Sequence, residues 1–349
     1  MTGSMLGLNR SIDHAMAPSV HMYDLFEEPE MMLRLCERIS PFSLYTSERV
    51  DHPIATGLAE RHDVMAHFLK HGNRFGQLGT VKEMARRTNY FRGELAYATQ
   101  KTDGIEAVLH HERIVAAAKL IHDAEIVVPN IVFANVVVPG QELAPHTDVP
   151  EFIGCNRKTM PQWLVVVMLR SGLFDAWRVK IATTVSWLTA GVGGAFACWP
   201  SGPDGDVIEV SPTPNSSFTI DNCNVVHAVD RFGPADAELA LLRPGMTLDF
   251  AIDTKSIVTA PSGEEIARYS IDDLRVALVW KGYCFEDERA LIRWQQQHEE
   301  LTIDVVISRL VDDLRERGRI GRVVPQSPEL GLLMIDEYVR YPSPSERCD

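Results

Sequence analysis

Residues 131–148 read Ile131-Val-Phe-Ala-Asn-Val-Val-Val-Pro-Gly-Gln-Glu-Leu-Ala-Pro-His146-Thr-Asp148, and this stretch decides the fold. Its first half is rich in Val and Ile, which is typical of a β-strand. Pro139-Gly140 predicts a turn after that strand. His146 and Asp148 stand two residues apart, so on extended backbone their side chains point to the same face. The stretch therefore predicts a strand, a turn and a second segment that presents an imidazole beside a carboxylate.

A third candidate ligand lies 79 residues further on, in the segment Asn224-Val-Val-His227-Ala-Val-Asp230. Two imidazoles and one carboxylate can hold iron(II) on one side and leave its other positions open, as in the 2-His-1-carboxylate triad. The alternative interpretation is a chance His-x-Asp match with a structural histidine elsewhere, since the chain has 12 His. The β-like context of both segments favours a metal site at His146, Asp148 and His227.

The pattern along the rest of the chain changes twice. Residues 28–119 mainly show helical spacing. From residue 126 onward, short runs rich in Val, Ile, Thr and aromatic residues alternate with turn residues and predict strands. The predicted strands cover 126–128, 131–138, 163–170, 179–189, 194–199, 206–210, 216–221, 225–229, 246–252 and 273–284. Helix returns at 287–317, where Leu301, Val305, Leu310 and Leu314 form an apolar stripe, and the Pro- and Ser-rich tail after Pro325 is expected to be partly mobile.

This order of elements predicts an α+β fold whose core is a double-stranded β-helix, the jelly-roll or cupin-like architecture. N-terminal helices and a C-terminal helical extension would pack on that core. We expect one integrated domain with three regions. They are an N-terminal arm and helical region at 1–124, the catalytic core at 125–285 with an insertion at about 233–269, and a C-terminal helix and tail at 286–349.

The composition limits the possible partners. Hydrophobic residues make up 45% of the 349 residues, and 34 Lys+Arg against 48 Asp+Glu give a formal net charge of -14. A protein that binds nucleic acid through its phosphates needs a basic face, so we expect no nucleic-acid partner. The six cysteines form no CxxC pair and are expected to be reduced thiols.

The sequence also predicts a cytoplasmic protein that binds no membrane. Residues 1–18 lack the basic and apolar segments of a secretory signal. No apolar run approaches the ~18–20 residues that cross a bilayer. The oligomeric state is left open.

Three segments, residues 135–148, Val225–Arg231 and Asp273–Trp280, resemble the iron(II)/2-oxoglutarate-dependent oxygenases, which have a double-stranded β-helix core. The resemblance implies that His146, Asp148 and His227 bind Fe(II), with 2-oxoglutarate and dioxygen as co-substrates. Members that halogenate lack the carboxylate of the triad, so Asp148 favours hydroxylation, desaturation or ring formation.

The resemblance further implies an arginine, on a strand after the distal histidine, that holds the distal carboxylate of 2-oxoglutarate; Asn135 is a further candidate contact. We favour Arg275, because it opens a predicted strand and places Ala277 and Val279 on its own face. In the family this arginine follows the histidine much more closely, so the insertion would have to loop out. Arg231 is the alternative, and Arg243 is a weaker third candidate.

The function that the resemblance implies is that of a 2-oxoglutarate-dependent dioxygenase. Its substrate would be a small molecule, either an amino acid or a natural-product intermediate, with hydroxylation of an unactivated C–H bond as the default reaction. The candidate substrate-binding residues are Glu151, Phe152, Arg157 and Trp163, and Lys281 and Tyr283 are expected near the mouth of the barrel. Two alternatives stay open: a non-catalytic jelly-roll protein that binds a ligand or metal, and an iron oxygenase that uses no 2-oxoglutarate and would not need Arg275.

Overall fold

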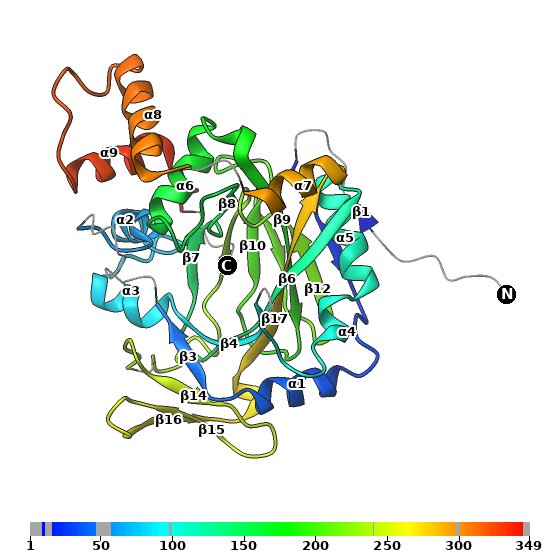
Figure 1. Cartoon of the computed structure of the whole chain (residues 1–349). Helices are drawn as coiled ribbons and strands as arrows, with labels where there is room; N and C mark the ends of the chain where they lie inside the picture. The colour runs from blue at the N-terminus through cyan, green and yellow to red at the C-terminus, as the bar shows by residue number, and fades with distance from the viewer. Residues whose placement is uncertain are drawn as a thin grey trace.

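The computed structural model describes residues 9–10, 16–46, 57–97, 100–239, 241–297 and 301–344. Most of the predicted arm at 1–18, and Cys348, lie outside the described residues. Two antiparallel sheets form the centre of the molecule, and helices cover its outside (Figure 1). The five described cysteines are buried free thiols.

The core consists of two sheets that face each other. The larger sheet contains, in this order, β12 (Ser216–Ile220), β9 (Arg178–Trp187), β17 (Arg275–Phe285) and β6 (Ile126–Val137). The smaller one contains β11 (Ile208–Val210), β10 (Phe196–Trp199), β13 (Val226–Val229) and β7 (Leu143–His146). Along the chain the strands alternate between the sheets, apart from the hairpin β10–β11. This order is that of a double-stranded β-helix, and the predicted fold class is confirmed.

Side-chain alternation along the strands separates the inside of the barrel from its outside. On β17, Ala277 and Val279 face inward and pack with Phe133 of β6 and Trp187 of β9. The alternate residues Val276, Leu278 and Trp280 belong to the cluster on the opposite face of the sheet. Because a strand's side chains alternate, the inward face of β17 also carries Arg275, as the sequence predicts.

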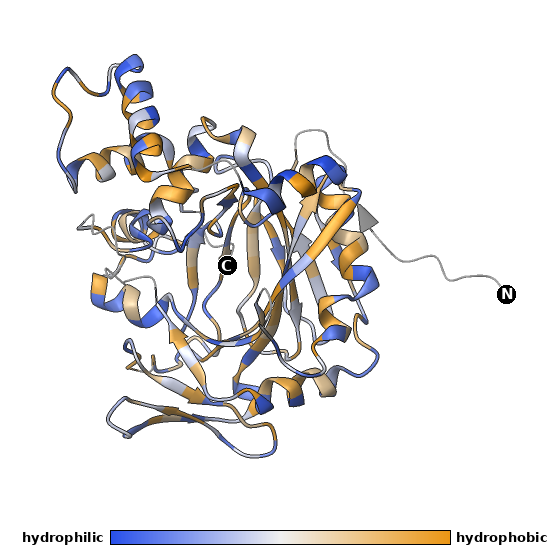
Figure 2. Cartoon of the chain, in the orientation of Figure 1, coloured by the Kyte–Doolittle hydropathy of each residue, from blue (hydrophilic) through white to orange (hydrophobic). Residues whose placement is uncertain are grey.

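Helices cover the outer face of the large sheet. They are α1 (Pro29–Arg38), α4 (Glu106–Leu109) and α5 (Glu112–His122), whose apolar sides join β6 and β17 in one buried cluster. Hydrophobic and hydrophilic colours alternate along α5 in Figure 2, as amphipathic packing requires. At this interface Trp280 donates its indole N–H to the carbonyl of Leu109 at 2.9 Å.

The N-terminal third is less helical than predicted. Besides α2 (His62–His71) and α3 (Val81–Arg87), it contains β3 (Phe42–Tyr45) and β4 (Tyr90–Tyr97), and β4 extends the large sheet beyond β6. Shorter strands complete the edges: β1 (Asn9–Arg10), β2 (Val20–Met22), β5 (Gln100–Lys101) and β8 (Glu151–Phe152). The predicted insertion forms β14 (Thr247–Asp249), β15 (Ser256–Thr259) and β16 (Glu265–Tyr269), which join the same sheet at β3. The division into three regions stays a prediction.

The predicted strand at 163–170 is wrong, because these residues belong to helix α6 (Gln162–Ser171). The run from Trp163 to Leu169 is buried on every side. It packs against α9 (Glu329–Tyr338) and the ends of the core strands. A short apolar run that is buried all round has no helical periodicity, so composition alone cannot separate it from a buried strand.

The C-terminal region also differs from the prediction. The single helix expected at 287–317 is two helices, α7 (Glu288–Gln296) and α8 (Ile303–Glu316), and the tail folds into α9. Leu301, Leu310 and Leu314 are buried as expected, but Val305 is 40% exposed. Two short 3-10 helices lie at Asp175–Trp177 and Ile271–Asp273. No helix in the described part of the chain is long and apolar enough to cross a membrane.

We expect Trp163→Ala to lower the free energy of unfolding by about 3–5 kcal/mol, because it removes a fully buried indole and leaves a cavity. Urea unfolding followed by tryptophan fluorescence measures this change. Ile292→Ala on α7 is the control, since Ile292 is 41% exposed and its loss should change stability by about 0.5 kcal/mol or less. Equal effects of the two variants would contradict the packing described for α6.

Candidate metal centre and its cavities

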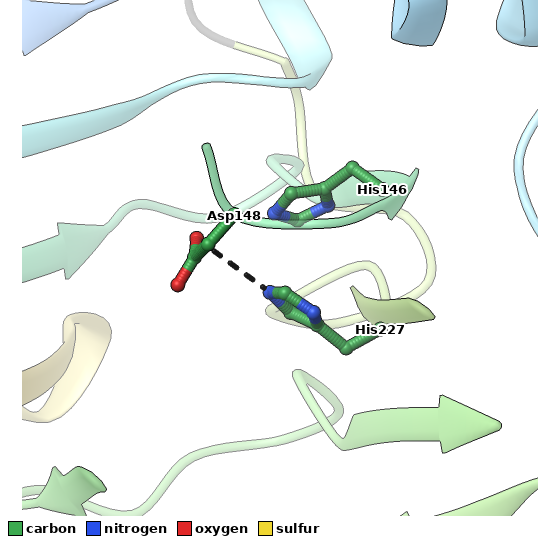
Figure 3. A group of neighbouring side chains, drawn as sticks. All are labelled: His146, Asp148 and His227. Carbon is green, nitrogen blue, oxygen red and sulfur yellow. Dashed lines mark ion pairs between the residues drawn. The ribbon is translucent and has the colours of Figure 1, made fainter. Parts of the chain in front are cut away.

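His146, Asp148 and His227 lie together between the two sheets (Figure 3). His146 ends β7 and His227 lies in β13, and the two histidines are direct partners in the antiparallel pair. Their ring centroids are 4.3 Å apart, and His227 Nε2 lies 4.0 Å from Asp148 Oδ1. One ligand atom from each of the three residues lies within 4.8 Å of the others. The strand pairing therefore brings together residues that are far apart in the sequence, at distances suited to a common ion.

The segment after β7 sets the direction of the carboxylate. The backbone N–H of Asp148 donates to the carbonyl of Asn222 at 2.8 Å, which continues the extended course of β7 past its last paired residue. Thr147 is fully buried and points away from the site. Alternation at i and i+2 thus turns His146 and Asp148 to the same side, as predicted.

Backbone carbonyls orient both imidazoles. His146 Nδ1 lies 2.7 Å from the carbonyl oxygen of Ala144, and His227 Nδ1 lies 3.1 Å from that of Val225. A carbonyl only accepts, so the neutral ring carries its proton on Nδ1 and keeps the Nε2 lone pair free for a metal. Burial lowers the pKa of both histidines, that of His146 to about 3, so both rings are neutral at physiological pH.

Asp148 uses its two carboxylate oxygens differently. Oδ1 faces His227, whereas Oδ2 accepts a hydrogen bond from the Lys281 ammonium at 2.7 Å. Burial alone would raise the pKa of Asp148, but the charge of Lys281 and its hydrogen bond to the carboxylate hold that pKa below its usual value. Asp148 therefore stays ionised, with one oxygen directed toward the histidines. Lys281 lies on the inward face of β17, where alternation places it.

Arg275 lies in a cavity that this triad also lines, together with Asn135. The residue is only 2% exposed. Its Nε donates to the carbonyl of Gly194 at 3.0 Å, and its Nη2 has no hydrogen-bond partner among the described residues. Burial lowers the pKa of Arg275 to about 10, so the guanidinium remains charged at neutral pH. A buried charge with an unused donor is unfavourable unless an anion binds there.

Other polar atoms surround the same cavity. Asn135 Oδ1 and Asn222 Oδ1 are buried and have no partner within the described part of the chain. Asn222, which the sequence analysis did not single out, follows the short strand β12. Gly194 adopts a positive φ of 68°, and a Cβ there would lie 3.0 Å from Arg275 Cδ. The glycine-rich turn at 191–194 thus accepts a hydrogen bond from Arg275 through the Gly194 carbonyl, and its lack of a side chain there leaves space for the arginine stem.

Two cavities adjoin the triad: the one that contains Arg275 and a second one that contains Arg157. Arg231, the alternative, lines neither of them. Its Nη2 donates to the carbonyl of Ala237 at 2.9 Å. Arg243 lines a separate apolar cavity with Val81 and Leu241. The geometry therefore favours Arg275 over both as a partner for a carboxylate near the triad.

The four candidate substrate-binding residues have different surroundings. Arg157 lines the second cavity next to the triad, together with Lys281. The Glu151 carboxylate accepts a hydrogen bond from the Tyr283 hydroxyl at 2.9 Å. Phe152 and Trp163 are buried in the cluster around α6 and line neither of the two cavities. Their suggested role in substrate binding is not supported, because Phe152 packs against Phe174 and Trp163 lies on a buried helix.

Several lining residues were missed by sequence reasoning. Arg61, Arg92 and Tyr90 line the cavity that contains Arg157, and Tyr90 lines the Arg275 cavity as well. They come from α2's N-terminus and from β4, in a region predicted to be mainly helical. Recognising β4 by its alternation in Tyr90-Phe-Arg-Gly-Glu-Leu-Ala-Tyr97 would have placed Arg92 on the strand next to β6.

Comparisons with known proteins give distant matches only. No protein-family model matches the chain, and neither does any curated protein sequence. Among solved structures, the chain is similar to a 2OG-Fe(II) oxygenase family oxidoreductase from Burkholderia pseudomallei, with 11% identity, TM-score 0.40, and coverage of 77% of this chain and 87% of that one.

Two further structures are similar over comparable lengths. A Pseudomonas putida prolyl-4-hydroxylase has 11% identity, TM-score 0.31, and coverage of 74% and 100%. HygX from Streptomyces hygroscopicus, solved with nickel, 2-oxoglutarate and hygromycin B, has 8% identity, TM-score 0.37, and coverage of 78% and 86%. At such identities and TM-scores, the activity of this chain has to follow from its own side chains.

Proposed function

We propose that this protein is an iron(II)- and 2-oxoglutarate-dependent oxygenase that oxidises a C–H bond of a small molecule. The observation that carries the proposal is one cavity that joins the His146–Asp148–His227 group to a buried arginine with an unused donor. Two imidazoles and one carboxylate are the donor set of non-haem iron(II) oxygenases. The residues present therefore fit both the metal and a dicarboxylate co-substrate.

Each residue has a distinct task in this proposal. His146 and His227 offer their Nε2 lone pairs, and Asp148 offers Oδ1 while Lys281 neutralises Oδ2. The Arg275 guanidinium holds the distal carboxylate of 2-oxoglutarate, since its planar donors match a carboxylate bidentately. With iron(II) and 2-oxoglutarate bound, dioxygen would be the oxidant, one of its oxygen atoms passing to succinate as 2-oxoglutarate loses carbon dioxide and the other to the substrate C–H bond.

The protein itself contributes orientation and exclusion of water. Phe133, Val185 and Phe196 line the Arg275 cavity and leave little room for solvent around the co-substrate. Phe196 also stacks on His227, with ring centroids 5.5 Å apart, which fixes the plane of that imidazole. These contacts hold the donors in place before any ligand arrives. Hydroxylation is the reaction that we propose as the default, because it needs nothing from the protein beyond this arrangement.

The two alternatives are weaker. A non-catalytic jelly-roll protein that only binds a ligand or metal has no need for a three-donor site that leaves positions on the metal open. An iron oxygenase without 2-oxoglutarate gives no reason to bury Arg275 at 2% exposure with an unused Nη2. Experiments can distinguish both alternatives from the proposal, because they differ in whether the protein binds iron(II) and whether it binds the keto acid.

We expect anaerobic addition of iron(II) and 2-oxoglutarate to produce the weak visible charge-transfer band of a metal-bound keto acid. The control ligand is 2-oxobutyrate, which has the same keto-acid head but no distal carboxylate for Arg275. It should bind at least about tenfold more weakly, since a charge-assisted hydrogen bond contributes about 1.5–3 kcal/mol. Titrations followed by absorbance measure both affinities.

Two results would contradict the proposal. Folded protein that binds iron(II) but gives no band with 2-oxoglutarate would favour an oxygenase of another kind. Folded protein that binds no iron(II) at all would favour the non-catalytic alternative.

A further inference from the structure

A second cavity adjoins the metal site and is lined by His146 and Asp148 but not by Arg275. It shares with the Arg275 cavity His146, Asp148, Tyr90, Phe133 and Leu143 but is otherwise lined by different residues. If the Arg275 cavity holds the co-substrate, as proposed above, this second cavity is the space left for the substrate. Its chemistry therefore indicates what kind of molecule is oxidised.

The cavity is basic, although the whole chain carries a net charge of -14. Its cationic residues are Arg61, Arg92, Arg157 and Lys281, and Asp148 is the only acidic residue among the described residues that line it. A cluster of positive charges in an acidic protein attracts anions to this place rather than to the surface at large.

Three of the four cations already have a carboxylate partner. Arg61 pairs with Asp63 at 2.9 Å, and both side chains are buried. Lys281 is paired with Asp148, as described for the metal site. Arg92 pairs with Glu94 at 2.6 Å, and its guanidinium carbon lies 3.6 Å from the centroid of the Phe133 ring.

Arg157 is different. It is half-buried at the cavity wall, and no ion pair or hydrogen bond of its side chain occurs among the described residues. A partly desolvated guanidinium without a counter-charge gains more from a bound anion than one that is already paired. Arg157 lies in the turn that follows β8, nine residues after Asp148.

Aromatic rings form another part of the wall. Tyr45 and Tyr90 stack with ring centroids 5.1 Å apart, and Tyr90 in turn stacks with Phe133 at 6.4 Å. Such rings suit the apolar or planar body of an organic molecule. Burial raises the pKa of Tyr90 to about 12, so its hydroxyl adds no negative charge near neutral pH.

We infer that the substrate is a small organic anion, a carboxylate or phosphate ester, whose charged group binds Arg157 while its apolar body lies against Tyr45 and Tyr90. The identification of this anion as the substrate rests on the proposed function. The anion site itself depends only on the side chains of the cavity.

Phenylacetate and phenylacetamide test this inference, because they share size and shape and differ in charge. Calorimetry on the full chain, with iron(II) and saturating 2-oxoglutarate under nitrogen, should show phenylacetate binding at least about tenfold more tightly than the amide. Arg157→Gln should remove that preference. Lys158→Gln is the matched control, since it deletes the same charge one residue away, where the ammonium lies 4.4 Å from the Tyr97 ring centroid instead of lining the cavity.

The inference would be overturned if the wild type bound the acid and the amide equally, or bound neither. It would also be overturned if the preference for the acid survived Arg157→Gln. The charge-transfer band is recorded in the same samples, with the calorimetry repeated without iron(II) and 2-oxoglutarate. A missing band together with Arg157-dependent acid binding would refute the proposed function and leave the anion site standing. A normal band without any preference for the acid would refute the anion site and leave the proposed function standing.

Discussion

His227→Ala is expected to weaken iron(II) binding by at least about 100-fold and to stop succinate formation. Changes in the residues that merely orient metal ligands lower affinity 10–100-fold in general, so loss of a ligand should do at least as much. His227 is buried and faces His146 across the β7–β13 pair, and among the described residues no fourth His, Cys, Asp or Glu joins the triad to replace its Nε2. Anaerobic iron(II) titration and a succinate assay measure the two effects.

His122→Ala is the matched control for this variant. His122 also lies 4.0 Å from a carboxylate, that of Asp221, and burial also lowers its pKa. The described residues place no third ligand beside it. Iron(II) binding should therefore be unchanged in His122→Ala. Retained iron(II) affinity in a folded His227→Ala variant would show that the metal binds elsewhere.

Arg275→Met is expected to raise the KM for 2-oxoglutarate about 100-fold with a smaller change in kcat. Two charge-assisted hydrogen bonds to a carboxylate contribute about 3 kcal/mol together, which corresponds to that factor. Met fills much of the space of the arginine stem, so the variant removes mainly the guanidinium, whose carbon lies 5.9 Å from the Trp187 ring centroid. Steady-state succinate formation at varied 2-oxoglutarate checks the result.

Arg231→Met serves as its control, because Arg231 bonds a backbone carbonyl and lines neither cavity. Its KM for 2-oxoglutarate should stay near the wild-type value. If Arg231→Met raised the KM and Arg275→Met did not, the co-substrate would have to lie elsewhere. Iron(II) affinity should be normal in both variants, which separates this result from that of His227→Ala.

The sequence predicted the core strands well because their alternation and turn residues are local. Each segment that carries the triad and Arg275 has its own Val- and Ile-rich context, so the strand assignment needed no knowledge of tertiary contacts. The 48-residue separation between His227 and Arg275 was the one doubtful feature. The structure explains this separation by the insertion. Its strands β14, β15 and β16 join the far edge of the sheet at β3, so β17 can still lie between β6 and β9.

What the sequence could not show depends on burial and on long-range pairing. Trp163 was placed on a strand because a helix buried on all sides loses its periodic pattern. Arg61 and Arg92 are ordinary charged residues in sequence, and only the pairing of β4 with β6 brings Arg92 to the cavity. The partner of Lys281 likewise follows from geometry, since Asp148 stands 133 residues away.

The central position of β17 also determines when the site can form during folding. β17 is the last strand of the core along the chain, yet it pairs with β6 on one side and β9 on the other. Until its residues have been synthesised and have inserted, β6 and β9 expose unpaired edges, and both Arg275 and Lys281 are missing from the cavities. Contacts that close such long loops form slowly. The chain should therefore acquire its ligand-binding capacity late and in one step, when this strand docks.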